Sequence, residues 1–412
     1  MKKVYLTVLS AIIPFLGFAK GDGPGEVDKK KPQTEDVKKT TEVKADDDSK
    51  SPFTFSGYLD SYYIGNLNRP QSRSNSGVAN ARAFDVTSGQ FQLGLVQTKM
   101  TYANDKSEAV VDLTFGPNAD LGNYGNLVSV LDPSYTGMAL AIKQAYFTYN
   151  FSDKFSMTAG QFGTHIGYEV IDAPVNFNYS LSNLFNNGPF YHTGVKATYA
   201  FSDRASLMMG LVNNVDGLGD NNRQKGFISQ LYFSPVENWG VYLNYMGSNE
   251  ASVDVPSVPQ DKAFYSIFDL TTSYQITERF LLGLNAAYGS QKGDFQGGGG
   301  PSEAQTWGGA AVYANVALTD VFGIGARYEN FNNTNGPRGL VNSNGVGTKV
   351  NSFTLTGNFT LANGHVLLKP EVRIDSYPKL GGSGETQQFE DENGNFTNNS
   401  QTTLGMAFIY SF

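Results

Sequence analysis

The 412-residue chain has no cysteine, little charge, and no long hydrophobic run after its first twenty residues. The lack of cysteine excludes a disulfide framework, a thiolate-bound zinc, an iron–sulfur cluster and a thiol nucleophile. Charged residues make up 17% of the chain and its net charge is −8, so it lacks the basic face of a nucleic-acid-binding protein. A membrane-spanning helix needs a run of about 18 apolar residues, and no such run follows residue 20.

Glycine and aromatic residues are abundant, and the C-terminal stretch 402–412 shows how they are arranged. Large apolar residues alternate there with mostly small or polar ones, which predicts a strand between lipid and a lumen. An edge strand of a soluble β-sandwich is the alternative. The terminal aromatic residue resembles the closing strand of bacterial outer-membrane barrels, where it serves as the assembly signal. We therefore assign barrel closure, and recognition by the barrel assembly machinery, to Tyr410 and Phe412.

Residues 1–19 predict a signal peptide. Lys2 and Lys3 precede an apolar run, and a small residue, Ala19, ends it. A membrane anchor is the alternative, but the run is short, so we expect cleavage after Ala19. Residues 20–52 mix Lys with Asp and Glu and contain no aromatic residue, which predicts a disordered, charged periplasmic leader.

Residues 53–412 repeat one unit, in which alternating apolar and polar segments are joined in turn by a short polar turn and a long polar loop. The short turns fall near residues 104–106, 152–154, 202–204, 235–237, 277–278, 319–320 and 362–364. The long loops fall near residues 66–84, 117–137, 166–189, 215–224, 248–262, 290–303, 333–349 and 376–401. This rhythm is typical of outer-membrane barrels with short periplasmic turns and long external loops. It predicts an all-β fold, a transmembrane antiparallel up-and-down β-barrel of about 16 strands with both termini periplasmic.

Several short motifs carry a resemblance to a known family. Gly160-Gln161-Phe162 ends one segment, and the motifs that follow it are Ile166-Gly167-Tyr168-Glu169, Asn178-Tyr179-Ser180 and residues 189–195. With these motifs, residues 53–412 resemble the OmpL-like β-barrel porins of Gram-negative outer membranes. The resemblance implies the barrel fold and the porin class, and it implies little about the solute.

Segment 365–376 places charge on one face only. Arg or Lys facing lipid at mid-depth costs about 2–4 kcal/mol, so we expect these charges to point into the lumen. They could brace the wall as an ion-pair ladder, line the pore, or do both, and we interpret them as pore-lining. The residues are Lys369, Glu371, Arg373 and Asp375. The same alternation adds Arg327, Glu329, Lys196, His192, Asp60, Asp112 and Asp269.

Loop 166–189 is unusually apolar for an external loop, where so much apolar surface would be a liability. We hypothesise that it enters the barrel as a constriction. Packing over the rim or at a subunit interface is the alternative. The candidate constriction residues are Asp172, Asn176, Asn178, Tyr179 and Phe185.

These features predict an outer-membrane porin that lets small hydrophilic solutes diffuse through a charged, water-filled lumen. A surface adhesin or structural barrel, which would use mobile polar loops at 297–300 and 381–400, is the main alternative. An enzyme is not expected, because no Gly-x-Ser-x-Gly motif accompanies the three histidines. We do not expect an energy-coupled transporter, because such a transporter needs a folded plug domain before the barrel and residues 20–52 are predicted to be disordered. We expect no cofactor and no metal; lipid of the outer membrane is a partner, and the sequence does not choose between a monomer and a homotrimer.

Overall fold

The structure, a computed structural model, describes residues 52–78, 82–123, 141–220, 222–251, 263–292, 303–381 and 386–412. Its barrel strands are β1 (Phe53–Asn66), β2 (Phe91–Ala103), β3 (Ser107–Phe115), β4 (Ile142–Ser152), β5 (Phe155–Gly163), β6 (Tyr191–Ser202), β7 (Ala205–Val212), β8 (Gly226–Phe233), β9 (Trp239–Asn249), β10 (Phe264–Thr277), β11 (Phe280–Gln291), β12 (Gln305–Ala317), β13 (Phe322–Asn332), β14 (Lys349–Leu361), β15 (Val366–Ser376) and β18 (Ser400–Ser411). The connections hold α1 (Pro117–Gly122), α3 (Asn183–Asn187), β16 (Phe389–Glu390), β17 (Phe396–Asn398) and the 3-10 turn η3 (Ala362–Gly364).

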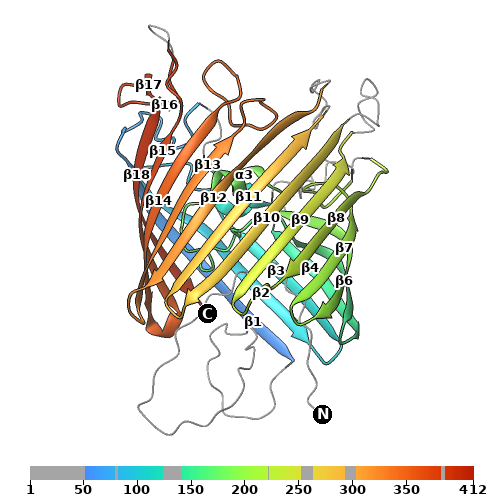
Figure 1. Ribbon diagram of the computed structural model, residues 1–412. Helices are drawn as coiled ribbons and strands as arrows, with labels where there is room; N and C mark the ends of the chain where they lie inside the picture. The colour runs from blue at the N-terminus through green and yellow to red at the C-terminus, as the bar shows by residue number, and fades with distance from the viewer. Residues whose placement is uncertain are drawn as a thin grey trace.

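These sixteen strands close into one antiparallel barrel (Figure 1). Each strand pairs with its neighbours along the sequence, and β18 pairs with both β15 and β1 to complete the ring. Among the described residues, no helix combines the length and the apolar character needed to cross a bilayer. The predicted antiparallel β-barrel and its strand number are therefore confirmed, and the periplasmic location of both termini stays a prediction.

The connections alternate in length as the sequence predicts. All seven short turns lie at the lower end of the barrel in Figure 1, and the long connections join strands at their upper ends. The described part of loop 381–400 is more ordered than its polar sequence suggests, because it forms the β16–β17 hairpin. The backbone of this hairpin accepts hydrogen bonds from the backbone of Gln71 and Val78. The predicted signal peptide, the leader up to residue 51 and the glycine run 297–300 lie outside the described residues.

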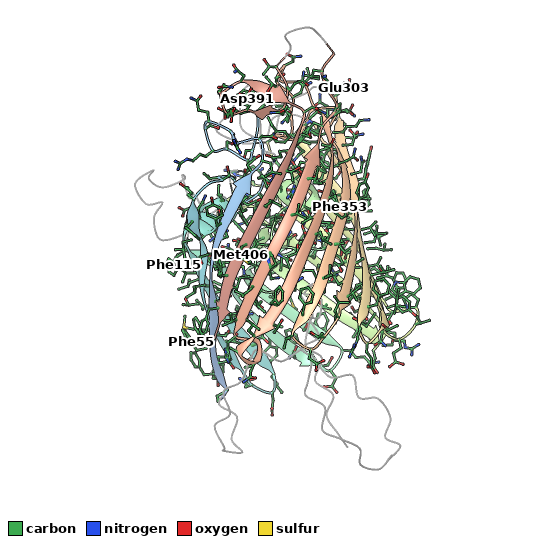
Figure 2. The ribbon with its side chains drawn as sticks, turned by 90° about the vertical axis from the view of Figure 1, so that its left-hand side faces the viewer. Phe55, Phe115, Glu303, Phe353, Asp391 and Met406 are labelled. Atoms are coloured by element: carbon green, nitrogen blue, oxygen red, sulfur yellow. The ribbon has the colours of Figure 1, made fainter. Side chains whose placement is uncertain are left out.

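The two faces of the barrel wall follow the alternation in the sequence. On β18, Leu404, Phe408 and Tyr410 are exposed on the outer face, whereas Ala407 and Ile409 are buried on the inner face. Figure 2 shows Phe353 and Met406 along the middle of the wall, between the turn end and the loop end where Glu303 and Asp391 lie. An apolar belt flanked by polar ends suits a wall that contacts lipid.

The closing contact between β18 and β1 is also as predicted. Tyr58 lies opposite Ser411, and the pairing continues to Asn66 opposite Thr403. The Gly57 N–H donates to the Phe412 carbonyl over 3.1 Å, and the Phe412 N–H donates to the Gly57 carbonyl over 3.0 Å. The assembly roles of Tyr410 and Phe412 stay predictions.

Two register shifts lie in the β1–β4 part of the wall. The β1–β2 ladder shifts between Leu59 and Ser61, and the β3–β4 ladder shifts between Asp112 and Leu113. A bulge inserts an extra residue and re-aims the side chains beside it. Both shifts adjoin aspartates that the sequence places in the lumen, Asp60 and Asp112.

Candidate functional site

The loop 164–190, between β5 and β6, runs inside the barrel and is bonded to several parts of the wall. The Gly167 N–H donates to Asp269 on β10 over 3.1 Å. The Tyr179 hydroxyl donates to Asp60 on β1 over 3.0 Å. The Asn178 side chain donates to Thr356 on β14 over 2.8 Å. We call residues 164–190 the inward loop.

Glu329 on β13 receives the start of helix α3. Its carboxylate accepts the backbone N–H groups of Asn183 over 2.8 Å and of Leu184 over 2.7 Å. The Ser182 side chain caps the same helix by accepting from the Phe185 N–H over 3.0 Å. The first N–H groups of a helix lack partners within the helix, so a wall carboxylate placed there fixes both position and orientation.

Arg327, two residues earlier on β13, bridges two points of the inward loop. Its guanidinium forms an ion pair with Glu169 and donates to the Ser180 carbonyl over 2.7 Å. The other oxygen of Glu169 accepts the Ser182 N–H over 2.7 Å. Arg327 is 1% exposed. The inward loop is thereby tied back on itself as well as to the wall.

The four charged residues of β15 also bond to loops. Glu371 accepts the Tyr179 N–H over 2.7 Å and the Ser180 N–H over 3.1 Å. Arg373 donates to the Leu181 carbonyl over 2.6 Å, and Lys369 donates to the Asn176 carbonyl.

Asp375 completes the β15 set and is held by two arginines. Arg373 donates to it over 2.8 Å within β15, and Arg82, from the loop between β1 and β2, approaches it at 2.8 Å. Arg82 also pairs with Asp85 of its own loop. Lys369, Arg373 and Asp375 are each 1% exposed. They lie between the wall and the loops, so any lining role for them in a pore stays a prediction.

On the β1–β4 side, carboxylates gather around one lysine. Lys143 on β4 contacts Asp172 of the inward loop and lies 3.4 Å from Asp112 on β3. The Gln97 amide donates to Asp172 over 2.9 Å and to Asp112 over 3.1 Å. Asp60 accepts from the Leu95 N–H and from the Tyr179 hydroxyl.

His192 and Lys196 on β6 face inward beneath the start of the inward loop. His192 shares a hydrogen bond of 3.0 Å with the Thr164 hydroxyl, and the Lys196 ammonium lies 4.2 Å from the Phe162 ring centroid. The His165 ring is 5.7 Å from that of His192, and burial lowers the pKa of His165 to about 4. In the described part of the chain, no carboxylate hydrogen-bonds to either histidine, so no Asp–His pair forms there.

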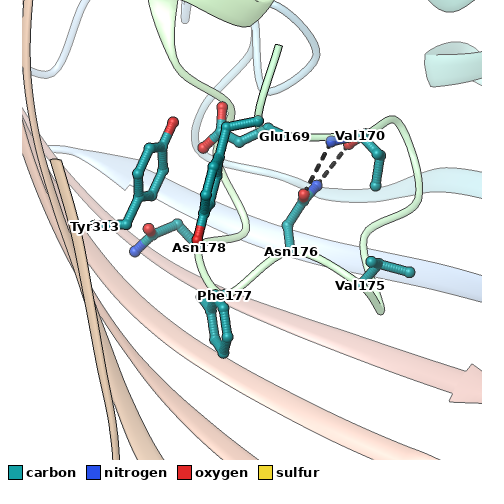
Figure 3. Close-up of a pocket in the computed structure, with 8 residues that line it drawn as sticks. Glu169, Val170, Val175, Asn176, Phe177, Asn178 and Tyr313 are labelled. Atoms are coloured by element: carbon teal, nitrogen blue, oxygen red, sulfur yellow. Dashed lines mark hydrogen bonds between the residues drawn. The ribbon is translucent and has the colours of Figure 1, made fainter. Parts of the chain in front are cut away.

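The candidate constriction residues take different places. Asn176 closes a turn by bonding to the backbone N–H and carbonyl of Val170 over 3.0 and 2.6 Å, as Figure 3 shows. The Phe185 ring stacks on Phe190 at 4.8 Å and contacts Phe84, so it packs within the loops. Asp172, Asn178 and Tyr179 bond to the wall through their side chains, whereas Asn176 bonds to it through its backbone carbonyl.

Two depressions lie on opposite sides of the inward loop. One faces β12 and is shown in Figure 3 with Glu169, Phe177, Asn178 and Tyr313 among its lining residues. The other faces β1 and β2. Its lining includes Asp60, Asp85, Asn118 and Tyr179.

Sequence reasoning missed several residues of this site. Arg82 and Asp85 lie in a loop without strand alternation. Lys143 lies on β4 beside a register shift, and a slip of one residue there exchanges the two faces of the strand, so alternation alone does not indicate its direction. Glu169 ends the motif Ile166-Gly167-Tyr168-Glu169, which resembles the OmpL-like porins, and this motif is the one sequence signal that could have identified Glu169 as a site residue.

A closed sixteen-strand barrel with an apolar outer belt and a polar interior is the architecture of an outer-membrane porin. The family model described as "Putative beta-barrel porin-2, OmpL-like" matches residues 52–412. The chain belongs to this family and is an outer-membrane porin.

Solved structures of outer-membrane proteins are similar in fold. The outer membrane channel DcaP of Acinetobacter baumannii is 11% identical with a TM-score of 0.54, covering 87% of this chain and 97% of that chain. The anion-selective porin from Comamonas acidovorans is 10% identical with a TM-score of 0.51, covering 87% and 99%. The trimer form of in-vitro folded OmpT from Vibrio cholerae is 12% identical with a TM-score of 0.50, covering 87% and 99%. No protein with a curated description matches the chain.

Proposed function

We propose that small hydrophilic solutes diffuse passively through the space between the barrel wall and the inward loop, which acts as the constriction. The observation that carries this proposal is the attachment of the inward loop to β1, β10 and β13–β15. A loop that sieves by size has to hold its position, and bonds to several walls supply that rigidity. Selection then combines the size of the opening with the field of the charges around it.

The residues divide into two roles under this proposal. Side chains that retain some exposure, such as Glu371 and Asp172, contact the solute path directly. Fully buried ones, such as Arg327, Glu329 and Arg373, hold the inward loop and act on solutes through their charge.

Reconstitution of the purified barrel tests the proposal. We expect discrete conductance steps in planar bilayers, and swelling of loaded liposomes in sugars that slows as the sugar becomes larger. A folded barrel that gives neither conductance nor swelling would contradict passive diffusion and favour the surface adhesin. Heat-dependent migration on a gel establishes that the barrel is folded in either case.

We also propose that the protein has no enzymatic activity, that it forms a homotrimer, and that Ala19 is the last residue removed with the signal peptide. The absence of an Asp–His pair among the described residues supports the first point. One similar structure described as a trimer form supports the second. Mass measurement of the detergent-solubilised protein tests the oligomeric state, and N-terminal sequencing of the mature protein tests the cleavage site.

A further inference from the structure

The two sides of the inward loop differ in their balance of charge. On the β13–β15 side, carboxylates have cationic partners or several N–H donors. Arg327 pairs with Glu169, and Arg373 pairs with Asp375. Glu329 and Glu371 each accept two backbone N–H groups of the inward loop. The negative charges on this side are therefore compensated.

On the β1–β4 side, negative charge is in surplus. The carboxylates of Asp112 and Asp172 contact the ammonium group of Lys143, and Lys99 lies opposite Asp112 in the β2–β3 ladder. No lysine or arginine of the described ranges forms an ion pair with Asp60, which is held by an N–H and a hydroxyl. The three carboxylates of Asp60, Asp112 and Asp172 outnumber the two ammonium groups by one, and Asp60 is the carboxylate without a cationic partner among the described residues.

The backbone is shaped to hold Asp60 where it is. Asp60 lies at the register shift of the β1–β2 ladder, and Gly94 of β2 faces it. A Cβ atom at Gly94 would lie 2.3 Å from a carboxylate oxygen of Asp60. The bulge and the glycine together make room for a carboxylate whose burial, without a cation, is costly.

One oxygen of Asp112, which is fully buried, has no hydrogen-bond partner in the described part of the chain. The buried hydroxyl of Tyr58 lies within electrostatic range of all three carboxylates. Buried polar atoms normally have a partner, so the Asp112 oxygen indicates a place where water or a hydrated ion is bound.

We propose that the porin prefers cations, and that they cross along the β1–β2 side of the inward loop, where Asp60 supplies the uncompensated charge. The depression on this side is lined by Asp60 itself. The inference rests on the proposed diffusion function and names the class of solute that this path favours. Asp60 acts on the ion through its electric field. The Tyr179 hydroxyl holds the Asp60 carboxylate at the edge of the inward loop.

Reversal potentials in a potassium chloride gradient across a planar bilayer test the inference. The wild-type channel is expected to favour potassium over chloride. In Asp60→Asn, which keeps the size of the side chain and an acceptor oxygen, the permeability ratio should fall about threefold, as expected for one charge about 6 Å from the path. Asp203→Asn makes the same change at an exposed turn and should leave the ratio unaltered.

Lys99→Met is a second variant, and it should change the potassium-to-chloride permeability ratio in the opposite direction. Removing the cation that faces Asp112 should raise the preference for potassium by a similar factor. A wild-type channel that favours chloride, or an unchanged ratio in both variants, would overturn the inference while leaving the diffusion function intact. Absence of any conductance in the folded wild-type barrel would instead overturn the diffusion function.

Discussion

The β13–β15 wall and the β1–β4 wall present charged residues to the same inward loop, but they use them differently. On the first wall, guanidinium and carboxylate groups bond to the backbone of the inward loop and to one another. On the second, Asp60 meets only neutral donors. The comparison indicates that one wall mainly fixes the inward loop in place, whereas the other supplies the field that a solute experiences.

This difference arises from the partners that the inward loop offers to each wall. Toward β13–β15 it presents the start of helix α3 and a run of backbone N–H and carbonyl groups. Toward β1–β4 it presents the Tyr179 hydroxyl and the carboxylate of Asp172. A charged residue on the inner face of a strand therefore acquires its role from the loop that covers it.

Deleting residues 172–186 should have the largest effect on the channel, because it removes the part of the inward loop that both walls contact. We expect single-channel conductance to rise several-fold, since the main obstruction in the lumen is lost. The charges of both walls would then face water, and their separate roles should disappear. Single-channel recording in planar bilayers measures the change.

The control for this deletion removes residues 391–395 at the tip of the β16–β17 hairpin, which lies outside the lumen. Its conductance should match that of the wild type. Equal conductance in the two deletions would show that the inward loop is no constriction.

Arg327→Met tests the anchoring role of the β13–β15 wall. The substitution leaves the buried carboxylate of Glu169 without its cation, and breaking a buried ion pair costs about 3–5 kcal/mol. We expect a loss of stability of that order in urea unfolding from lipid vesicles, together with noisier open-channel currents. Arg279→Met, at the exposed β10–β11 turn, should change stability by less than about 0.5 kcal/mol. Equal stability of the two variants would argue against anchoring.

The sequence predicts the barrel architecture well, because strand alternation and turn length are local signals. The predicted turns, the strand number and the closing pair of β18 with β1 agree with the structure. The inward direction of Arg327, Glu329 and the β15 charges follows from the same alternation, since charge on the outer face would meet lipid.

The partners of these charges could not be predicted in the same way. Arg327 bonds to Glu169 and Ser180, about 150 residues away in the chain, and no periodic pattern reports such a contact. Bulges add a second obstacle, because a shift of one residue exchanges the two faces of a strand. Lys143 was missed for that reason, and the balance of charge on the β1–β4 wall could not be counted without it.

A matched pair of substitutions compares the two walls directly. Lys143→Met and Lys369→Met remove the same charge, but Lys143 faces aspartates near Asp60 whereas Lys369 donates to the carbonyl of Asn176. We expect Lys143→Met to raise the potassium-to-chloride ratio about threefold. Lys369→Met should lower stability and change the ratio less. Equal shifts in reversal potential in the two variants would contradict the proposal that the β1–β4 wall, and not the β13–β15 wall, sets the field along the solute path.

Gly94→Ala is the mildest change, and it tests whether the wall is shaped around the Asp60 carboxylate. The added methyl group would lie 2.3 Å from one carboxylate oxygen and 2.7 Å from the other, so the end of that side chain has to move. Because a side chain yields more easily than backbone, we expect a cost of about 1 kcal/mol and a less than about twofold change in the potassium-to-chloride ratio. Gly65→Ala is the matched control, since its nearest neighbour lies 3.9 Å away. A shift in reversal potential confined to Gly94→Ala would show that selectivity depends on the position of the Asp60 carboxylate. An identical result for both glycine variants would show that selectivity does not depend on that position.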